Sequence, residues 1–204
     1  MVAENTCFFN FPAAARVWFN GFMIITIGGN LGAGKTTLAN NLAEALGYEQ
    51  LYVGGIFREM ATEKGLSIKQ FYAQLKNDPA LEQAVDRRQA AAMHERDNLI
   101  VQGRVAWHFA KGSPFKVFNI FLSVDPAVGA KREAKKDDRT EVSADEDVTA
   151  ATAERERLER ERYAMLYGIK DHLDPQHYDF MLDTTTLAEK EVAQKVLAAL
   201  PVEG

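Results

Sequence analysis

The chain of 204 residues is 47% hydrophobic and carries a formal net charge of −5. This length suits one domain with its own core, and the negative charge argues against a nucleic-acid binder that relies on a positive surface. A single cysteine, Cys7, excludes an intramolecular disulfide and favours a reducing, cytoplasmic setting.

The first 22 residues contain an apolar stretch that Asn10, Pro12 and Arg16 interrupt. It lacks the basic segment of a signal peptide. Nowhere does the chain offer the roughly 20 apolar residues of a transmembrane helix. We therefore expect an N-terminal extension over 1–22 and no membrane association. Met23 opens the first core strand, and our hypothesis is that it is the natural initiator methionine.

Residues 23–27 are apolar and β-branched, as in a buried strand, and residues 29–36 read Gly-Asn-Leu-Gly-Ala-Gly-Lys-Thr. This fits the phosphate-binding pattern G-x-x-x-x-G-K-[ST], and Leu38, Leu42 and Leu46 follow at helical spacing before Gly47. Glycines let several backbone N–H groups point at one anion, and the helix adds its positive end. We expect Lys35 to reach the β- and γ-phosphates and the Thr36 hydroxyl to bind Mg²⁺. The predicted nucleotide-binding residues are Gly29, Asn30, Leu31, Gly32, Ala33, Gly34, Lys35, Thr36 and Thr37.

The next segment predicts a short strand over 51–53, a turn at Gly54-Gly55, and then helices. Ile56 and Met60 share one helical face that ends at Gly65. Residues 67–70 form a capping box, Ser-x-x-Gln, and Asp78-Pro79 is a typical helix start.

Strands are predicted over 99–101, 117–124 and 180–182, and a helix begins at Asp125-Pro126. Residues 131–162 are dominated by charge. Thr186 is expected to cap a last helix that Pro201 ends. The alternation of strands and helices predicts an α/β fold with a parallel sheet, whose ligands bind at the carboxyl ends of the strands.

Two arginines follow predicted strands. Arg104 comes directly after Gly103, where its guanidinium would lie at the ligand edge and match phosphate oxygens; the alternative is a pair with a carboxylate. Arg58 is either a second phosphate ligand or a solvated surface residue.

The charged helix over 154–162 places Arg155, Glu159 and Arg162 on one face. Arg157 and Arg160 fit exposed pairs with glutamates at i,i+4. A helix that brings arginines over a phosphate loop, together with two phosphate sites, favours phosphoryl transfer. That chemistry needs neutralised charge and in-line oxygens, and no covalent nucleophile.

With these elements placed, the sequence resembles the cytidylate kinase family, in the compact form common in archaea, from about Met23 to Leu200. The matching stretches are Ile25 to Thr37, Gly54 to Arg58, Asp86 to Gln89, Gly103-Arg104 with Ala106-Trp107, Arg155 to Tyr163, and Leu182 to Thr185.

The resemblance implies a three-layer P-loop kinase with a central parallel sheet over 23–204. It also implies a helical nucleoside-monophosphate (NMP)-binding insertion at about 54–97 and a lid at about 131–163. Such an enzyme moves the γ-phosphate of ATP onto CMP or dCMP with Mg²⁺, so its partners are small-molecule nucleotides, and we expect a monomer.

The resemblance also implies roles for single residues. Lys35, Arg155 and Arg162 would be catalytic. Arg58 and Arg104 would hold the acceptor phosphate, and Asp86 and Arg87 would lie near the acceptor base or sugar. Glu159 would orient the arginines or touch the sugar.

Two positions depart from the family pattern. Gly55 stands where an acid is frequent, and Gln102 stands where Asp or Glu is common. Gln102 can neither bind Mg²⁺ as a charged group nor take a proton from the acceptor phosphate, but that phosphate is already largely ionised near neutral pH. The alternatives are a kinase for another nucleoside monophosphate or small acceptor, and a nucleotide-binding relative without turnover.

Overall fold

The computed structural model describes residues 23–75, 78–134 and 148–201, without the side chains of residues 69, 79, 134 and 148–156. The predicted extension over 1–22, with Cys7, lies outside the described residues. So does 135–147, which is part of the expected lid.

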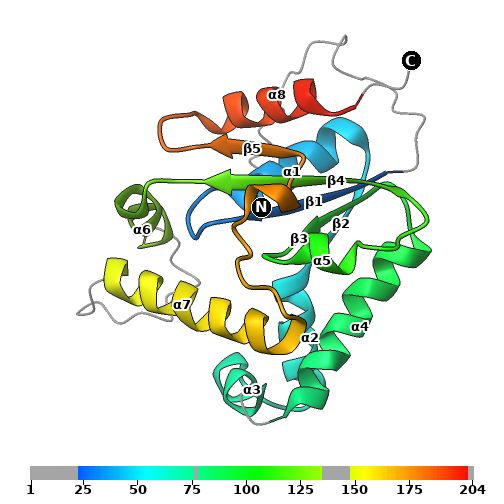
Figure 1. Cartoon of the computed structure of the whole chain (residues 1–204), viewed down its shortest axis with the longest axis vertical. Coiled ribbons are helices and arrows are strands. Elements are labelled where there is room, and N and C mark those ends of the chain that lie inside the picture. The colour runs from blue at the N-terminus through cyan, green and yellow to red at the C-terminus, as the bar shows by residue number, and fades with distance from the viewer. Residues whose placement is uncertain (1–22, 76–77, 135–147, 202–204) are drawn as a thin grey trace, which may run out of the picture.

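The centre of the fold is a five-stranded parallel sheet in the order β2-β3-β1-β4-β5 (Figure 1). Its strands are β1 (Met23–Gly29), β2 (Glu49–Tyr52), β3 (Leu99–Gln102), β4 (Lys116–Ser123) and β5 (Phe180–Asp183). Every residue of β1 is buried, because β3 and β4 flank it and helices cover both faces. The sheet confirms the predicted α/β class.

Eight α-helices are described in these parts of the chain. They are α1 (Lys35–Leu46), α2 (Val53–Glu63), α3 (Ile68–Leu75), α4 (Pro79–Glu95), α5 (Ala106–Phe109), α6 (Pro126–Ala134), α7 (Val148–Tyr167) and α8 (Glu189–Ala199). A short 3₁₀ helix, η2, spans Pro175–His177.

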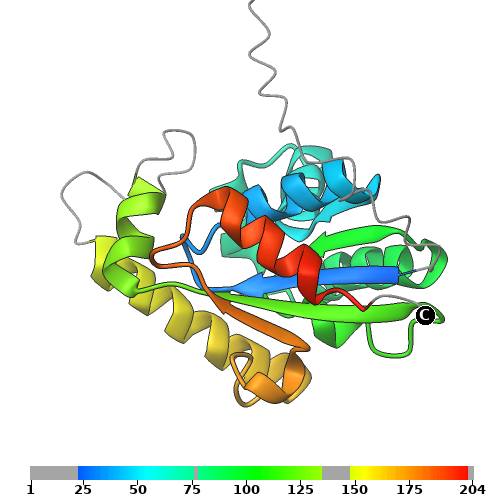
Figure 2. The ribbon, with the colours of Figure 1, turned by 90° about the horizontal axis from the view of Figure 1, so that it is seen from above.

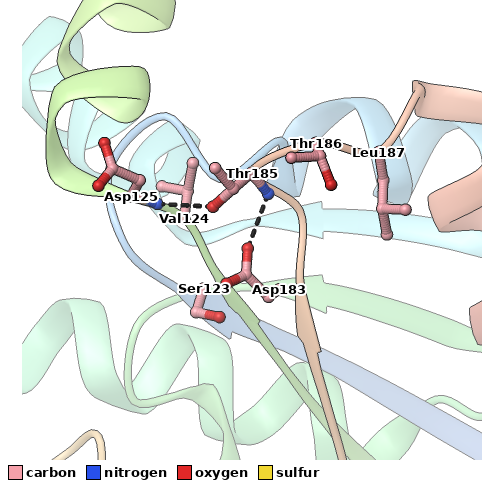
Figure 3. Close-up of a pocket in the computed structure, with 7 residues that line it drawn as sticks. All are labelled: Ser123, Val124, Asp125, Asp183, Thr185, Thr186 and Leu187. Carbon is pink, nitrogen blue, oxygen red and sulfur yellow. Dashed lines mark hydrogen bonds between the residues drawn. The ribbon is translucent and has the colours of Figure 1, made fainter.

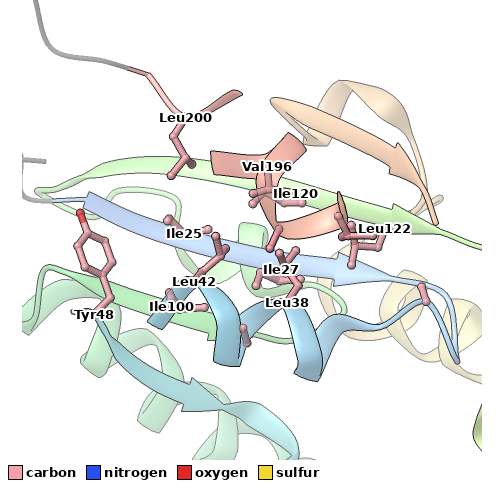
Figure 4. Packing of buried hydrophobic residues seen from close by; sticks show 14 of the residues in the cluster. Ile25, Ile27, Leu38, Leu42, Tyr48, Ile100, Ile120, Leu122, Val196 and Leu200 are labelled. Atoms are coloured by element: carbon pink, nitrogen blue, oxygen red, sulfur yellow. The ribbon is translucent and has the colours of Figure 1, made fainter. Parts of the chain in front are cut away.

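One face of the sheet packs against α1 and α8. Figure 2 shows α8 lying across β1 and β4, and Figure 4 shows side chains of both helices pointing toward the strands. Leu38 and Leu42 of α1 contribute to this layer, as predicted, and are 2% and 0% exposed. Burial of such side chains stabilises the fold by about 1.5–3 kcal/mol each.

The opposite face of the sheet packs against α4 and α5, where Ile24, Met93 and Ala106 meet. Alternate residues of β1 therefore serve opposite faces, which makes three layers. A separate apolar cluster joins α2, α3 and α4 around Ile56, Phe71 and Val85, so these helices have a small core of their own.

Several predicted helix ends are confirmed. The Asp78 side chain accepts hydrogen bonds from the backbone N–H groups of Ala80 and Leu81, at 3.1 and 3.3 Å. Gln70 accepts from the backbone N–H of Ser67 at 2.9 Å, which closes the capping box. Gly47 ends α1 with a left-handed φ of 70°.

Two local predictions are wrong. Gly54 and Gly55 lie inside α2 and form no turn, because the helix begins at Val53, directly after β2; a Cβ on Gly54 would lie 2.6 Å from the Tyr52 ring. Thr186 does not cap the last helix: α8 begins at Glu189, and the Glu191 carboxylate accepts from the Ala188 backbone N–H at 2.8 Å.

Candidate active site

The loop between β1 and α1 has a backbone that only glycines adopt readily. Gly29, Gly32 and Gly34 have φ values of 141°, 72° and 88°. A Cβ on Gly29 would lie 2.2 Å from the carbonyl oxygen of Leu122 in β4. The loop is therefore held directly against the sheet, as the motif predicts.

Lys35 opens α1 and curls back over this loop. Its Nζ donates to the carbonyl oxygens of Gly29 and Asn30, at 2.9 and 2.5 Å. The ammonium thus lies beside the loop at the helix N-terminus, which is the position where an anion is favoured. Within the loop, Asn30, Leu31 and Gly34 are half-buried and Ala33 is buried.

Thr36 and Thr37 follow in the first turn of α1, and both are half-buried. Gln102, at the end of β3, donates from Nε2 to the Thr36 hydroxyl oxygen at 2.9 Å. Mg²⁺ takes oxygen ligands and usually keeps several waters, so it needs few ligands from the protein. The Thr36 hydroxyl, with phosphate oxygens and water, is therefore chemically compatible with the predicted Mg²⁺ site. No group of three or more His, Cys, Asp or Glu in the described ranges forms a metal cluster of its own.

A cavity of about 520 Å³ lies at the carboxyl ends of β4 and β5 (Figure 3). Its lining residues are Ser123, Val124, Asp125, Asp183, Thr185, Thr186 and Leu187. The backbone N–H of Asp125 donates to the Thr185 hydroxyl oxygen, and the backbone N–H of Thr185 donates to Asp183 Oδ1, both at 2.8 Å. These bonds fix the rim of the cavity.

Arg132 of α6 ties this rim to the phosphate loop. Its Nη2 donates to the carbonyl oxygens of Thr184 and Thr185 at 2.9 and 3.2 Å, and its Nη1 lies 3.4 Å from the carbonyl oxygen of Gly32. The Thr184 hydroxyl also donates to the Ala33 carbonyl at 3.1 Å. These contacts hold the loop against the segment that follows β5 and borders the cavity.

Glycines allow α6 to approach the loop backbone to backbone. A Cβ on Gly32 would lie 2.2 Å from the Gly129 carbonyl oxygen, and a Cβ on Gly129 would lie 2.6 Å from the Leu31 carbonyl oxygen. Any side chain at either position would push α6 away from the loop.

Carboxylates contact two of the predicted phosphate-binding arginines. Arg104 forms an ion pair with Glu159 of α7, and these side chains are only 13% and 14% exposed. Arg162 of α7 forms an ion pair with Glu82 of α4, with Nε and Oε1 3.2 Å apart. The inner face of α7 therefore faces both the end of β3 and α4, as the spacing of Glu159 and Arg162 predicts.

A second contact joins α4 to α7. The Tyr167 hydroxyl donates to Asp86 Oδ2 at 2.7 Å, and Gln89 donates to Asp86 Oδ1 at 3.3 Å. Burial raises the pKa of the Asp86 carboxyl above its ordinary value, although these hydrogen bonds and nearby arginines oppose the shift. Asp86 is thus half-buried where α4 meets α7.

The remaining predicted residues are spread more widely. Arg58 is exposed, with its guanidinium 5.4 Å from the centroid of the Tyr52 ring, and Arg87 is exposed on α4. Arg155 lies in α7, but its side chain is outside those described. Arg157 forms an exposed pair with Glu161, which confirms that it belongs to a solvated salt bridge.

Sequence reasoning missed three residues of this region. Gly129 carried a usable signal, because glycine inside a helix marks a close approach. Arg132 was hidden at the start of the charged run. Glu82 had no signal apart from its place between the apolar Leu81 and Val85.

None of the helices in the described parts of the chain combines the length and the apolar composition that a membrane span requires.

A model of the cytidylate kinase-like family matches residues 24–186. The cytidylate kinase of Pyrococcus abyssi is 38% identical over 180 residues, which cover 88% of this chain and 94% of that protein. That of Methanopyrus kandleri is 36% identical over 189 residues, covering 89% and 95%. Among solved structures, the shikimate kinase of Bacteroides thetaiotaomicron superposes with a TM-score of 0.64 at 14% identity, covering 88% of this chain and 98% of that one. The shikimate kinase of Acinetobacter baumannii gives a TM-score of 0.55 at 20% identity, covering 90% and 94%. These two structures share the fold.

Proposed function

Because the chain belongs to the cytidylate kinase-like family, we propose that it transfers the γ-phosphate of ATP to CMP or dCMP. The observation that carries this proposal is the proximity of two phosphate-binding elements at one sheet edge. Lys35 and its loop follow β1, and Arg104 follows the adjacent strand β3. The backbone N–H of Gly103 donates to the Ile27 carbonyl at 3.2 Å, which holds the two strand ends together.

The donor nucleotide would lie along the loop, with its base in the cavity at the carboxyl ends of β4 and β5. Arg132 and Thr184 donate to the loop carbonyls of Gly32 and Ala33, so the loop lies beside the segment that borders the cavity, which supports this placement. Lys35 would leave the carbonyls of Gly29 and Asn30 and bind the β- and γ-phosphates. Thr36 would hold Mg²⁺, whose charge neutralises phosphate oxygens.

The acceptor would lie between β3, α4 and α7. Arg58 and Arg104 would bind its phosphate, and Asp86 and Arg87 would lie near its base or sugar. Arg155 and Arg162 would steady the transferring group, and Glu159 would orient the arginines. The contacts of Arg104 with Glu159 and of Arg162 with Glu82 support this assignment, because a phosphate is the anion that can replace a carboxylate on a guanidinium.

Phosphoryl transfer does not require Gln102 to act as a general base. A phosphate monoester has a second pKa near 6, so the acceptor oxygen is largely ionised at neutral pH and needs no strong base. Gln102 would instead fix the Thr36 hydroxyl through its 2.9 Å hydrogen bond.

Two segments would close over the substrates: the insertion at about 54–97 and the lid at about 131–163. The separate core of α2, α3 and α4 supports the first as a unit. Closure would exclude water and so limit hydrolysis of ATP. We also propose that the protein works as a cytoplasmic monomer.

A coupled ADP-release assay with ATP, Mg²⁺ and a panel of nucleoside monophosphates tests the function. We expect rapid turnover with CMP and dCMP and slow turnover with AMP, GMP and UMP. Preference for another acceptor would reassign the substrate. Tight nucleotide binding without turnover on any acceptor would refute the enzymatic proposal.

A further inference from the structure

Glu82 is an acidic residue in an apolar position of α4. It is 5% exposed, and its helix neighbours Leu81 and Val85 are buried in the cluster that joins α2, α3 and α4. Burial raises the pKa of the Glu82 carboxyl, and the positive charge of Arg162 opposes the shift. A buried carboxylate is costly unless a cation faces it, so its partner explains its position.

That partner is Arg162, and the atom facing Glu82 is its Nε, 3.2 Å from Oε1. The contact is an ion pair without an aligned hydrogen bond. The guanidinium also lies 5.3 Å from the centroid of the Tyr163 ring. Glu82 and Tyr163 therefore restrain the guanidinium at its inner nitrogen and at its face.

A guanidinium has five N–H donors in a rigid fork. When Nε faces Glu82, Nη1 and Nη2 form the other edge of the fork, which has the geometry for bidentate binding of phosphate oxygens. An arginine held in this way loses less conformational freedom when the substrate arrives, and its charge needs less reorientation during the reaction.

We propose that Glu82 is a positioning residue, which orients the Arg162 guanidinium toward the phosphoryl group. This inference rests on the proposed function, because Arg162 binds the transferring phosphate only in that proposal. Glu82 lies on α4 and Arg162 on α7, so this pair couples the NMP-binding helices to the lid helix. The arginine is then in position when the two segments are together.

The alternative is that Glu82 only stabilises the packing of α4 on α7. The two roles differ in what they predict for a conservative variant. A purely structural pair, once broken, lowers the melting temperature and leaves the rate of the folded enzyme unchanged. Loss of a positioning residue, in contrast, lowers kcat of the folded enzyme, and it does so only while Arg162 is present.

The experiment is a double-mutant cycle on the full chain with E82Q, R162A and E82Q/R162A, together with E82D. Steady-state kcat and KM for ATP and CMP are measured well below the melting temperature of each variant, which circular dichroism gives. We expect kcat of E82Q to fall about tenfold with KM for ATP within about twofold, because the neutral amide no longer attracts the guanidinium of Arg162 and so orients it less firmly. E82D, which keeps the charge, should retain more activity than E82Q.

The decisive comparison is between R162A and E82Q/R162A. Adding E82Q to R162A should cause no further loss of kcat. A matched control is E63Q, which breaks the exposed bidentate pair of Glu63 with Arg88 between α2 and α4. It should leave all kinetic constants unchanged. Equal kcat for E82Q and the wild type, or an equal loss from E82Q in both backgrounds, would overturn the role of Glu82 and leave the proposed function intact. Absence of CMP turnover by the wild type would refute the proposed function, and this inference with it.

Discussion

The contact of α6 with the phosphate loop makes a specific prediction for Gly129→Ala. The new Cβ would lie 2.6 Å from the Leu31 carbonyl oxygen and 3.0 Å from Val124 Cγ1. The oxygen belongs to the backbone, so it cannot rotate away, and either α6 or the loop must shift. Overpacking of this kind costs about 1–3 kcal/mol.

Helix propensity acts in the opposite direction. Alanine is favoured over glycine by up to about 1 kcal/mol inside a helix. The net expectation for Gly129→Ala is therefore a loss of up to about 2 kcal/mol in the free energy of unfolding. Because Leu31 belongs to the loop, ATP affinity should fall as well.

Urea unfolding, followed by circular dichroism, measures the stability, and isothermal titration calorimetry measures ATP affinity. Gly55→Ala is the matched control, since Gly55 is also helical but its new Cβ would meet Tyr52 at an ordinary 3.6 Å. That variant should be as stable as the wild type or more so. A Gly129→Ala protein with unchanged stability and unchanged ATP affinity would refute the reasoning.

Three further predictions concern the site and its support. Lys35→Ala should reduce phosphoryl transfer by about 10²–10³-fold in the coupled assay and keep the wild-type circular dichroism spectrum; near-normal activity would contradict its role. Arg104→Ala should raise KM for CMP about tenfold or more and leave calorimetric ATP affinity within about twofold; a collapse of ATP affinity would place Arg104 on the donor. Burial, reinforced by the charge of Glu159, raises the pKa of Tyr163 from 10.0 to about 12, so the folded protein holds this proton more firmly than the unfolded chain. Stability present below pH 10 should therefore fall by about 2 kcal/mol as the pH rises from about 10 to 12, and Tyr163→Phe should reduce that fall in urea titrations; an unchanged pH dependence would contradict the buried hydroxyl.

The sheet and the phosphate loop were predictable because local pattern and tertiary structure agree there. The run that became β1 is apolar and buried on both faces. The loop glycines hold left-handed conformations that only glycine adopts easily. Local rules of this kind need no knowledge of distant contacts.

The errors arose where the contacts of particular side chains outweigh the local preference of a residue type. Gly54 lies in α2 although glycine disfavours helices, and a side chain at this position would clash with the Tyr52 ring, which an added Cβ would approach to 2.6 Å. The start of α8 depends on the Glu191 carboxylate reaching back to Ala188, which overrides the better cap residue Thr186.

The candidate site divides in the same way. Lys35, Thr36 and Arg104 follow strand ends, so their positions were predictable from the order of elements. The partners Glu82 and Arg162 are far apart in the sequence, and only the packing of α4 on α7 brings them together. No spacing rule connects such residues.

The central claim is that two anionic nucleotides meet end to end, one on the loop of Lys35 and the other beside Arg104. Inhibition by a bisubstrate mimic, with adenosine and cytidine joined through a polyphosphate chain, tests it most directly. The account predicts tight inhibition that is competitive with both ATP and CMP and is weakened by Lys35→Ala and by Arg104→Ala. Inhibition that competes with only one substrate, or that neither substitution affects, would contradict it.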